Sequence, residues 1–216
     1  MGRHDPPVDY DGHPHALLLP AGSVLWRVHS RHRPAEAFKP YRREYALGRF
    51  DGGDDDPYGT LYLASDEVTA VAEVLMRGLP YGRTGHRFVP YDAVRGRRLS
   101  AVRVTAELRL IDLVRGAALG AVCQDDWLIY CAESEFDKTR RWASWLRAQD
   151  GLAAGMMWTT RRNLVNRSVV LFADRGAALE PASLPAVDLD SGPGLDWLNE
   201  HLRQFRTSVN RPGPAW

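Results

Sequence analysis

Segments with the patterning of strands and of helices follow one another along the chain without a regular repeat, and this irregular order most restricts the folds that the chain can adopt. Short apolar or alternating runs predict strands at residues 24–28, 60–64, 99–105, 107–113, 155–159 and 168–172. Longer amphipathic runs predict helices at residues 66–77 and 195–205, and another that begins at Ser134 or Glu135 and ends at Gln149. Doubly wound folds need strands and helices in regular alternation, so we expect an α+β protein.

The 216 residues are expected to form one domain with an appendage at each end. Residues 1–21 are rich in Pro, Gly, His and Asp and are expected to form a loosely ordered arm. The domain covers residues 22–175, and residues 176–216 form a C-terminal extension with one amphipathic helix. Its apolar stripe could pack on its own core, which is the preferred interpretation, or form a homodimer contact. The stripe consists of Trp197, Leu198, Leu202 and Phe205.

Charge, hydropathy and cysteine content exclude several classes of protein. Lys and Arg number 28 against 27 Asp and Glu, so the net charge of +1 gives no field that attracts nucleic acid, and direct nucleic-acid binding is not expected. No apolar run approaches the roughly 20 residues that cross a bilayer, and the N-terminus lacks the apolar segment of a secretory signal. Cys123 and Cys131 are too few for a disulfide framework, so free thiols and a cytoplasmic location are expected.

Metal-binding and phosphate-binding motifs are absent from the sequence. Two histidine clusters, at residues 13–15 and 29–32, lack cysteine or carboxylate partners at zinc spacing. The acidic run at residues 54–56 lacks the alternating ligands of a calcium loop. Neither a P-loop nor a glycine-rich dinucleotide fingerprint occurs. The sequence therefore predicts no bound metal.

Six separated segments carry the most information about function. They are 25–29 (LWRVH), 48–51 (GRFD), 59–64 (GTLYLA), 69–73 (TAVAE), 158–162 (WTTRR) and 169–172 (VVLF). In this order and at these intervals they resemble the RES domain, which is named for an arginine, a glutamate and a serine. The resemblance covers roughly residues 22–175.

The resemblance implies a compact, ADP-ribosyltransferase-like fold with a mixed β-sheet core flanked by helices. It also implies that NAD is the substrate and that no metal is needed. RES domains supply the toxin of toxin–antitoxin pairs whose antitoxin is a helix-turn-helix (Xre-like) protein. Such toxins degrade NAD by hydrolysis or phosphorolysis at the nicotinamide–ribose bond. Two alternatives stay open: an ADP-ribosyltransferase that modifies a protein or nucleic acid, and a catalytically inactive binding module of the same fold.

The resemblance assigns roles to individual residues. The family's arginine falls on Arg27 and its glutamate on Glu73, while a second arginine of the family's Gly-Arg segment falls on Arg49. The serine position falls on Thr160, which departs from the family but keeps a hydroxyl group, and Thr159 is the competing register.

The chemistry of these residue types agrees with the assignment. Loss of nicotinamide gives a transition state like the oxocarbenium ion of glycoside cleavage, which the carboxylate of Glu73 could stabilise. The guanidinium of Arg27 suits bidentate contacts to a pyrophosphate, and the hydroxyl of Thr160 could position the ribose or a phosphate. A flat aromatic face suits the nicotinamide ring. The candidates for that stacking are Tyr45, Phe50 and Tyr62.

Each of these residues also has a purely structural interpretation. Glu73 could form a salt bridge with Arg77 one helical turn away. Arg27 could be a surface residue at the end of a strand, and Thr160 could bond the backbone of its own turn. The resemblance favours catalysis for Glu73.

Overall fold

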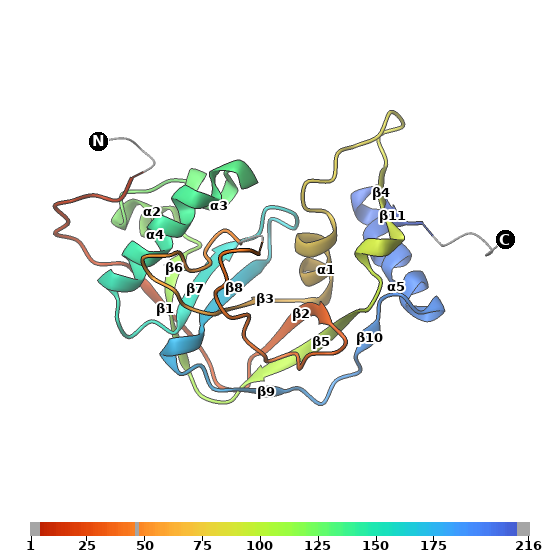
Figure 1. Ribbon diagram of the computed structural model, residues 1–216, viewed down its shortest axis with the longest axis horizontal. Coiled ribbons are helices and arrows are strands. Elements are labelled where there is room, and N and C mark those ends of the chain that lie inside the picture. The colour runs from red at the N-terminus through yellow and green to blue at the C-terminus, as the bar shows by residue number, and fades with distance from the viewer. Residues whose placement is uncertain (1–4, 46–47, 211–216) are drawn as a thin grey trace.

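The computed structural model describes residues 5–45 and 48–210 of the chain. These residues form an α+β protein with a large mixed sheet flanked by helices, as predicted (Figure 1). The strands at residues 60–64 and 155–159 have the predicted bounds. Within the described ranges, no helix combines the length and the apolar character that crossing a membrane requires.

The main sheet orders its strands β1-β6-β7-β8-β3-β2-β5-β10, and β9 also pairs with β5. Neighbouring strands are antiparallel except for β6 and β7, which run parallel. The strands are β1 (Ala16–Leu19), β2 (Val24–Ser30), β3 (Thr60–Ala64), β5 (Arg97–Val104), β6 (Leu108–Leu113), β7 (Gly155–Thr159), β8 (Arg167–Phe172), β9 (Leu179–Pro181) and β10 (Val187–Asp188).

The register of this sheet aligns one row of residues across four strands. Trp26 of β2 lies opposite Ala64 of β3, Ala64 lies opposite Ser168 of β8, and Ser168 lies opposite Trp158 of β7. Paired residues of neighbouring strands project from the same face of a sheet. The row therefore presents four side chains on one face of the sheet.

The connection between β5 and β6 forces the sheet to curl. Val104 ends β5 and Leu108 begins β6, so the chain can span at most about 14 Å between them. In a flat sheet of this strand order, β6 and β5 would lie about 24 Å apart. Curling brings the two ends together around a buried cluster that includes Leu25, Val102 and Leu110.

One group of helices packs on β6, β7 and β8. This group consists of α2 (Gly116–Ala121), α3 (Trp127–Tyr130) and α4 (Phe136–Gln149), and it lies at the left of Figure 1. Trp142 and Leu146 of α4 are fully buried in one cluster with Met156 of β7 and Phe172 of β8. This packing fixes α3 and the start of α4 beside the row of residues described above.

A second group of helices lies over β2 and β5, at the right of Figure 1. It contains α1 (Glu67–Leu75) and α5 (Gly192–Leu202), together with a small parallel sheet of β4 (Arg87–Val89) and β11 (Thr207–Val209). Helix α1 begins after Asp66, whose side chain accepts a hydrogen bond from the Thr69 N–H. Ser65 precedes this cap, and its hydroxyl accepts from the Arg167 N–H of β8 instead.

Both ends of the predicted domain differ from expectation. Within the arm expected over residues 1–21, Ala16–Leu19 form β1 and pair with β6, because this run of apolar residues can complete the edge of the sheet. Within the extension expected over residues 176–216, β9 and β10 pair with β5. The main sheet therefore includes residues from both segments. The expected amphipathic helix is α5, and Leu198 and Leu202 on its stripe are fully buried against α1 and its neighbours.

Candidate active site

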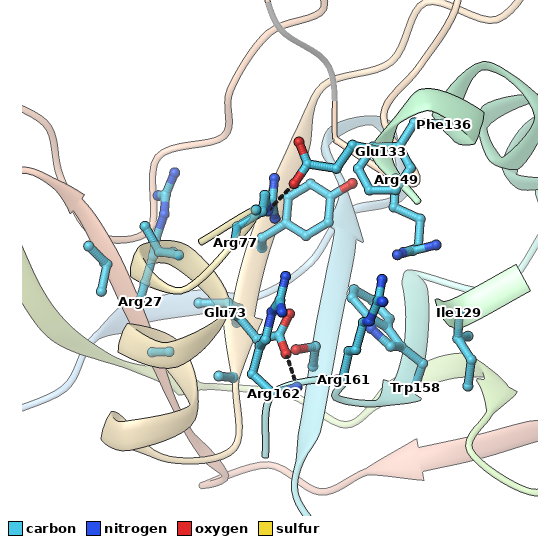
Figure 2. A pocket seen from close by; sticks show the side chains of 18 of the residues that line it. Arg27, Arg49, Glu73, Arg77, Ile129, Glu133, Phe136, Trp158, Arg161 and Arg162 are labelled. Atoms are coloured by element: carbon cyan, nitrogen blue, oxygen red, sulfur yellow. Dashed lines mark hydrogen bonds and ion pairs between the residues drawn. The ribbon is translucent and has the colours of Figure 1, made fainter. Parts of the chain in front are cut away.

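A cavity of about 640 Å³ opens between the two groups of helices. Its floor includes the row formed by Trp26, Ala64, Ser168 and Trp158. Helix α1 contributes one wall, and residues at the end of α3 and the start of α4 contribute another (Figure 2). Small-molecule sites commonly enclose about 300–1,000 Å³, so this cavity is large enough for such a ligand.

Arg27 lies on β2 and lines this cavity. Its Nη1 donates to the carbonyl oxygens of Ala35 and Ala37, each at 2.7 Å, which fixes the guanidinium against the following loop. Burial and the nearby Arg33 lower the pKa of Arg27 to about 10, so the side chain is still a cation at neutral pH. Its Nη2 and Nε have no hydrogen-bond acceptor among the described residues and are available to a ligand.

Glu73 lies in the last turns of α1 and lines the same cavity. Its Oε1 accepts a hydrogen bond of 2.9 Å from the backbone N–H of Arg162 (Figure 2). No salt bridge joins it to Arg77, whose Nε lies 3.9 Å from Oε1 of Glu133. The structural interpretation of Glu73 as half of a helix salt bridge is therefore wrong. Its Oε2 makes no hydrogen bond within the described chain.

Arg49 lines the opposite wall, and its side chain is held by the end of α3. Nη1 donates to the Leu128 carbonyl at 3.2 Å and to Sγ of Cys131 at 2.9 Å, and Nη2 donates to the Cys131 carbonyl at 3.1 Å. The guanidinium carbon lies 4.6 Å from the ring centre of Phe136. Burial lowers the pKa of Arg49, while the contact with Cys131 opposes this effect. These bonds give Arg49 an anchoring role, because they fasten residues 48–51 to the end of α3.

Of the three aromatic candidates for stacking, Tyr62 alone lines the cavity. Its hydroxyl accepts the Phe50 N–H at 2.9 Å, and burial raises the pKa of the Tyr62 phenol well above its usual value. Phe50 is fully buried, with its ring centre 5.1 Å from that of Trp158, so it is a core residue. Tyr45 is 51% exposed and lies outside the cavity lining. The structure therefore does not support stacking by Phe50 or Tyr45.

Thr160 lies outside the lining and is fully buried. Its Oγ1 donates to the Asn163 carbonyl at 2.5 Å and accepts from the Asn163 N–H at 3.1 Å, so the hydroxyl bonds its own turn. Thr159, the competing register, ends β7 and does not line the cavity either. These positions contradict the expectation that Thr160 contacts the substrate, and its structural interpretation holds.

Ser168 places a hydroxyl group in the cavity that the sequence analysis missed. The side chain is 5% exposed, and its Oγ has no hydrogen-bond partner among the described residues. Alternation along β8 could have indicated it, because Ser168 shares a face with Val170 and Phe172 of the core.

Positive charge dominates the lining. It contains six cationic side chains and two carboxylates: Arg27, Lys39, Arg49, Arg77, Arg161 and Arg162 against Glu73 and Glu133. Lys39 is paired with Asp51, whose Oδ2 lies 3.0 Å from its Nζ. A cavity of this composition suits an anionic ligand, because arginine forks match carboxylate and phosphate oxygens.

The described residues contain no cluster of three or more His, Cys, Asp or Glu side chains that could hold a metal ion. Both cysteines are free thiols, Cys123 exposed and Cys131 buried beside Arg49. Burial raises the pKa of the Cys131 thiol, although the neighbouring Arg49 opposes this shift. The polar groups of the cavity are carboxylates, guanidinium groups and hydroxyls, together with the Lys39 amine and the Cys131 thiol.

The curled mixed sheet, the two groups of helices and the cavity between them define an α+β protein with a cationic cavity of a size suited to a small molecule. The family model of the RES domain matches residues 24–191, so the chain belongs to the RES domain family.

A chain of the M. tuberculosis MbcT–MbcA toxin–antitoxin complex has a similar structure, with a TM-score of 0.55 and 19% sequence identity. The match covers 79% of this chain and 85% of that chain, and it shows that the two share a fold. No curated protein sequence matches this one.

Proposed function

We propose that this protein is the toxin of a toxin–antitoxin pair and that it degrades NAD by cleaving the nicotinamide–ribose bond. Its membership of the RES domain family and the toxin–antitoxin origin of the similar structure support this proposal. The observation that carries it is the convergence of Arg27 and Glu73, which lie on different elements and line one cavity.

Arg27 and Glu73 have different roles in this reaction. The free donors of Arg27 bind the pyrophosphate, since a guanidinium forms bidentate contacts with phosphate oxygens. Oε1 of Glu73 is occupied by the Arg162 N–H, which orients the carboxylate and leaves Oε2 free for the ribose. A negative charge fixed beside the sugar stabilises the oxocarbenium-like transition state more than the ground state, and this difference accelerates the reaction. Tyr62 and Trp158 supply aromatic faces in the same cavity for the nicotinamide ring.

The bond that breaks joins C1′ of the ribose to the ring nitrogen of nicotinamide. Its electron pair passes to the pyridinium nitrogen, so nicotinamide leaves as a neutral molecule and needs no metal or general acid. An oxygen of water or phosphate then bonds to C1′ and releases its proton where the acceptor is water. The products are nicotinamide and either ADP-ribose or ADP-ribose that carries a phosphate on the same carbon.

The acceptor distinguishes degradation from transfer. Purified protein is incubated with NAD labelled in the adenosine moiety, with and without inorganic phosphate, and with a cell extract as a source of macromolecules. Label in small products together with free nicotinamide supports degradation. Label retained on a protein or nucleic acid supports the alternative of an ADP-ribosyltransferase, and NAD binding without turnover supports an inactive binding module.

The partner in this proposal is a helix-turn-helix (Xre-like) antitoxin that acts in the cytoplasm by covering the cavity. A small reading frame of that class beside the gene would identify it. Co-purification of its product should suppress nicotinamide release, and equal release by the free toxin and the complex would contradict this arrangement.

A further inference from the structure

Arg161 and Arg162 differ from the other cations of the cavity because nothing in the described chain pairs with their side chains. Lys39 and Arg77 have carboxylate partners, and Arg49 and Arg27 donate to backbone carbonyls. Neither guanidinium at 161 or 162 makes a hydrogen bond or ion pair with any described residue. Figure 2 shows both side chains projecting into the cavity, Arg162 beside Glu73 and Arg161 beside Trp158.

Burial and neighbouring positive charges act on the Arg162 guanidinium. Arg162 is half-buried, and burial lowers the pKa of its guanidinium. The neighbouring Arg161, Arg87 and Arg77 lower that pKa further, and Glu73 opposes them. Partly desolvated like charges repel one another unless a counter-ion lies between them. A bound anion would therefore relieve repulsion as well as accept hydrogen bonds.

The turn that carries the two arginines is held in place by hydrogen bonds. Thr160 and Asn163 bond each other within the turn, and Nδ2 of Asn163 donates to Oγ1 of Thr69 on α1 at 3.0 Å. The backbone N–H of Arg162 donates to Glu73 one helical turn further along. One backbone and one side-chain hydrogen bond thus hold the turn against α1, so it can present its guanidinium groups without a large ordering cost on binding.

We propose that Arg161 and Arg162 form a phosphate-binding subsite of this cavity. The subsite binds a phosphate group, which belongs either to the dinucleotide or to free inorganic phosphate. That a dinucleotide enters the cavity rests on the proposed function. Two arginine forks match the tetrahedral oxygens of a phosphate group. The subsite lies on the turn after β7, so it adds a second phosphate contact to the one from Arg27 on β2.

Isothermal titration calorimetry with two probes, ADP-ribose and inorganic phosphate, tests the subsite. The variants are Arg161→Gln, Arg162→Gln and the double variant. Arg203→Gln is the matched control, because Arg203 is exposed and outside the cavity lining. We expect the double variant to bind one probe at least tenfold more weakly, or about 1.4 kcal/mol, and the control to bind like the wild type. Arg162→Gln should have the larger single effect, because the half-buried charge is screened less by water and salt.

The pattern of loss identifies the source of the phosphate. Weaker binding of ADP-ribose alone places the dinucleotide in the subsite, and weaker binding of inorganic phosphate alone places the free ion there. Unchanged affinity of the double variant for both probes overturns the proposal, as does a wild-type protein that binds neither.

Nicotinamide release from NAD, measured on the same preparations, separates this inference from the proposed function. If the wild type binds a probe through the two arginines but releases no nicotinamide, the subsite is supported and the proposed function is wrong. If the wild type releases nicotinamide and the double variant binds both probes as the wild type does, the proposed function is supported and the subsite is wrong.

Discussion

The carboxylate of Glu73 accepts a hydrogen bond of 2.9 Å from the backbone N–H of Arg162, although 89 residues separate the two in sequence. This bond joins α1 to the turn between β7 and β8, so the proposed catalytic group and the arginine-bearing turn form one unit. Changes to the turn should therefore alter the position of the carboxylate.

Replacement of Arg27 by lysine should lower kcat/KM for NAD at least tenfold. Lysine keeps the positive charge but loses the planar fork, and it cannot hold the Ala35 and Ala37 carbonyls while contacting a phosphate. Initial rates of nicotinamide release at several NAD concentrations give the value. Arg83→Lys, at an exposed position outside the lining, should match the wild type. Equal kcat/KM for Arg27→Lys and the wild type would show that the Arg27 guanidinium does not bind the substrate.

Thr160→Val should raise KM for NAD and lower kcat, each several-fold, because it removes both hydrogen bonds that close the turn around Asn163, and this turn carries the arginines and holds the Glu73 carboxylate. The Asn163 N–H loses its partner, while the Asn163 carbonyl keeps the Asn166 N–H, so the free energy of unfolding should also fall by about 0.5–1.5 kcal/mol. Thr160→Ser keeps the hydroxyl and should restore these quantities. The exposed Thr105 gives the control Thr105→Val.

A different split of the kinetic constants would count against this role. If Thr160→Val lowered kcat at unchanged KM and unchanged stability, the hydroxyl would act on the reacting atoms, and its buried position in the turn would not explain its function.

Asp51→Asn should lower the free energy of unfolding near neutral pH and make it less sensitive to a fall in pH. Burial raises the pKa of Asp51, but hydrogen bonds from the Gly48 N–H and from Lys39 outweigh burial and lower the pKa overall. Because the folded-state pKa lies below the unfolded value of about 3.9, the carboxylate stabilises the fold above that pH. This contribution is lost as pH falls through the depressed pKa.

Thermal unfolding of the wild type and of Asp51→Asn between about pH 7 and pH 2 measures that contribution. The two melting temperatures should converge as the pH falls. Asp54→Asn, at an exposed carboxylate, is the matched control and should follow the wild type. Parallel curves for Asp51→Asn and the wild type over the whole range would show that the Asp51 charge does not contribute.

Local sequence patterns predicted the elements whose signals lie within one segment. Alternation located β3 and β7 at their observed bounds, and the spacing of apolar residues located α1 and α4. The short strands β9 and β10 were missed because they have three and two residues and depend on pairing with β5. β1 was missed because its apolar run follows a segment rich in Pro and Gly.

The resemblance pointed to residues that line the cavity, whereas positions set by contacts between distant segments had no signal in the sequence. Arg27 and Glu73 were assigned from their segments, and both line the cavity. Thr160 matched the serine position by type, but only the fold shows that its hydroxyl bonds its own turn while Ser168 faces the cavity. Arg162 belongs to the segment 158–162 of the resemblance, but its contact with Glu73 has no signal in the sequence.

The central claim is that the Glu73 carboxylate stabilises the sugar cation formed as nicotinamide leaves. Its most direct test is the initial rate of nicotinamide release from NAD by the wild type, by Glu73→Gln, and by Glu67→Gln on the same helix outside the lining. Glutamine keeps an acceptor for the Arg162 N–H but removes the charge. We predict a rate at least about 100-fold lower for Glu73→Gln and an unchanged rate for Glu67→Gln. No release by the wild type, or equal rates for Glu73→Gln and the wild type, would contradict the claim.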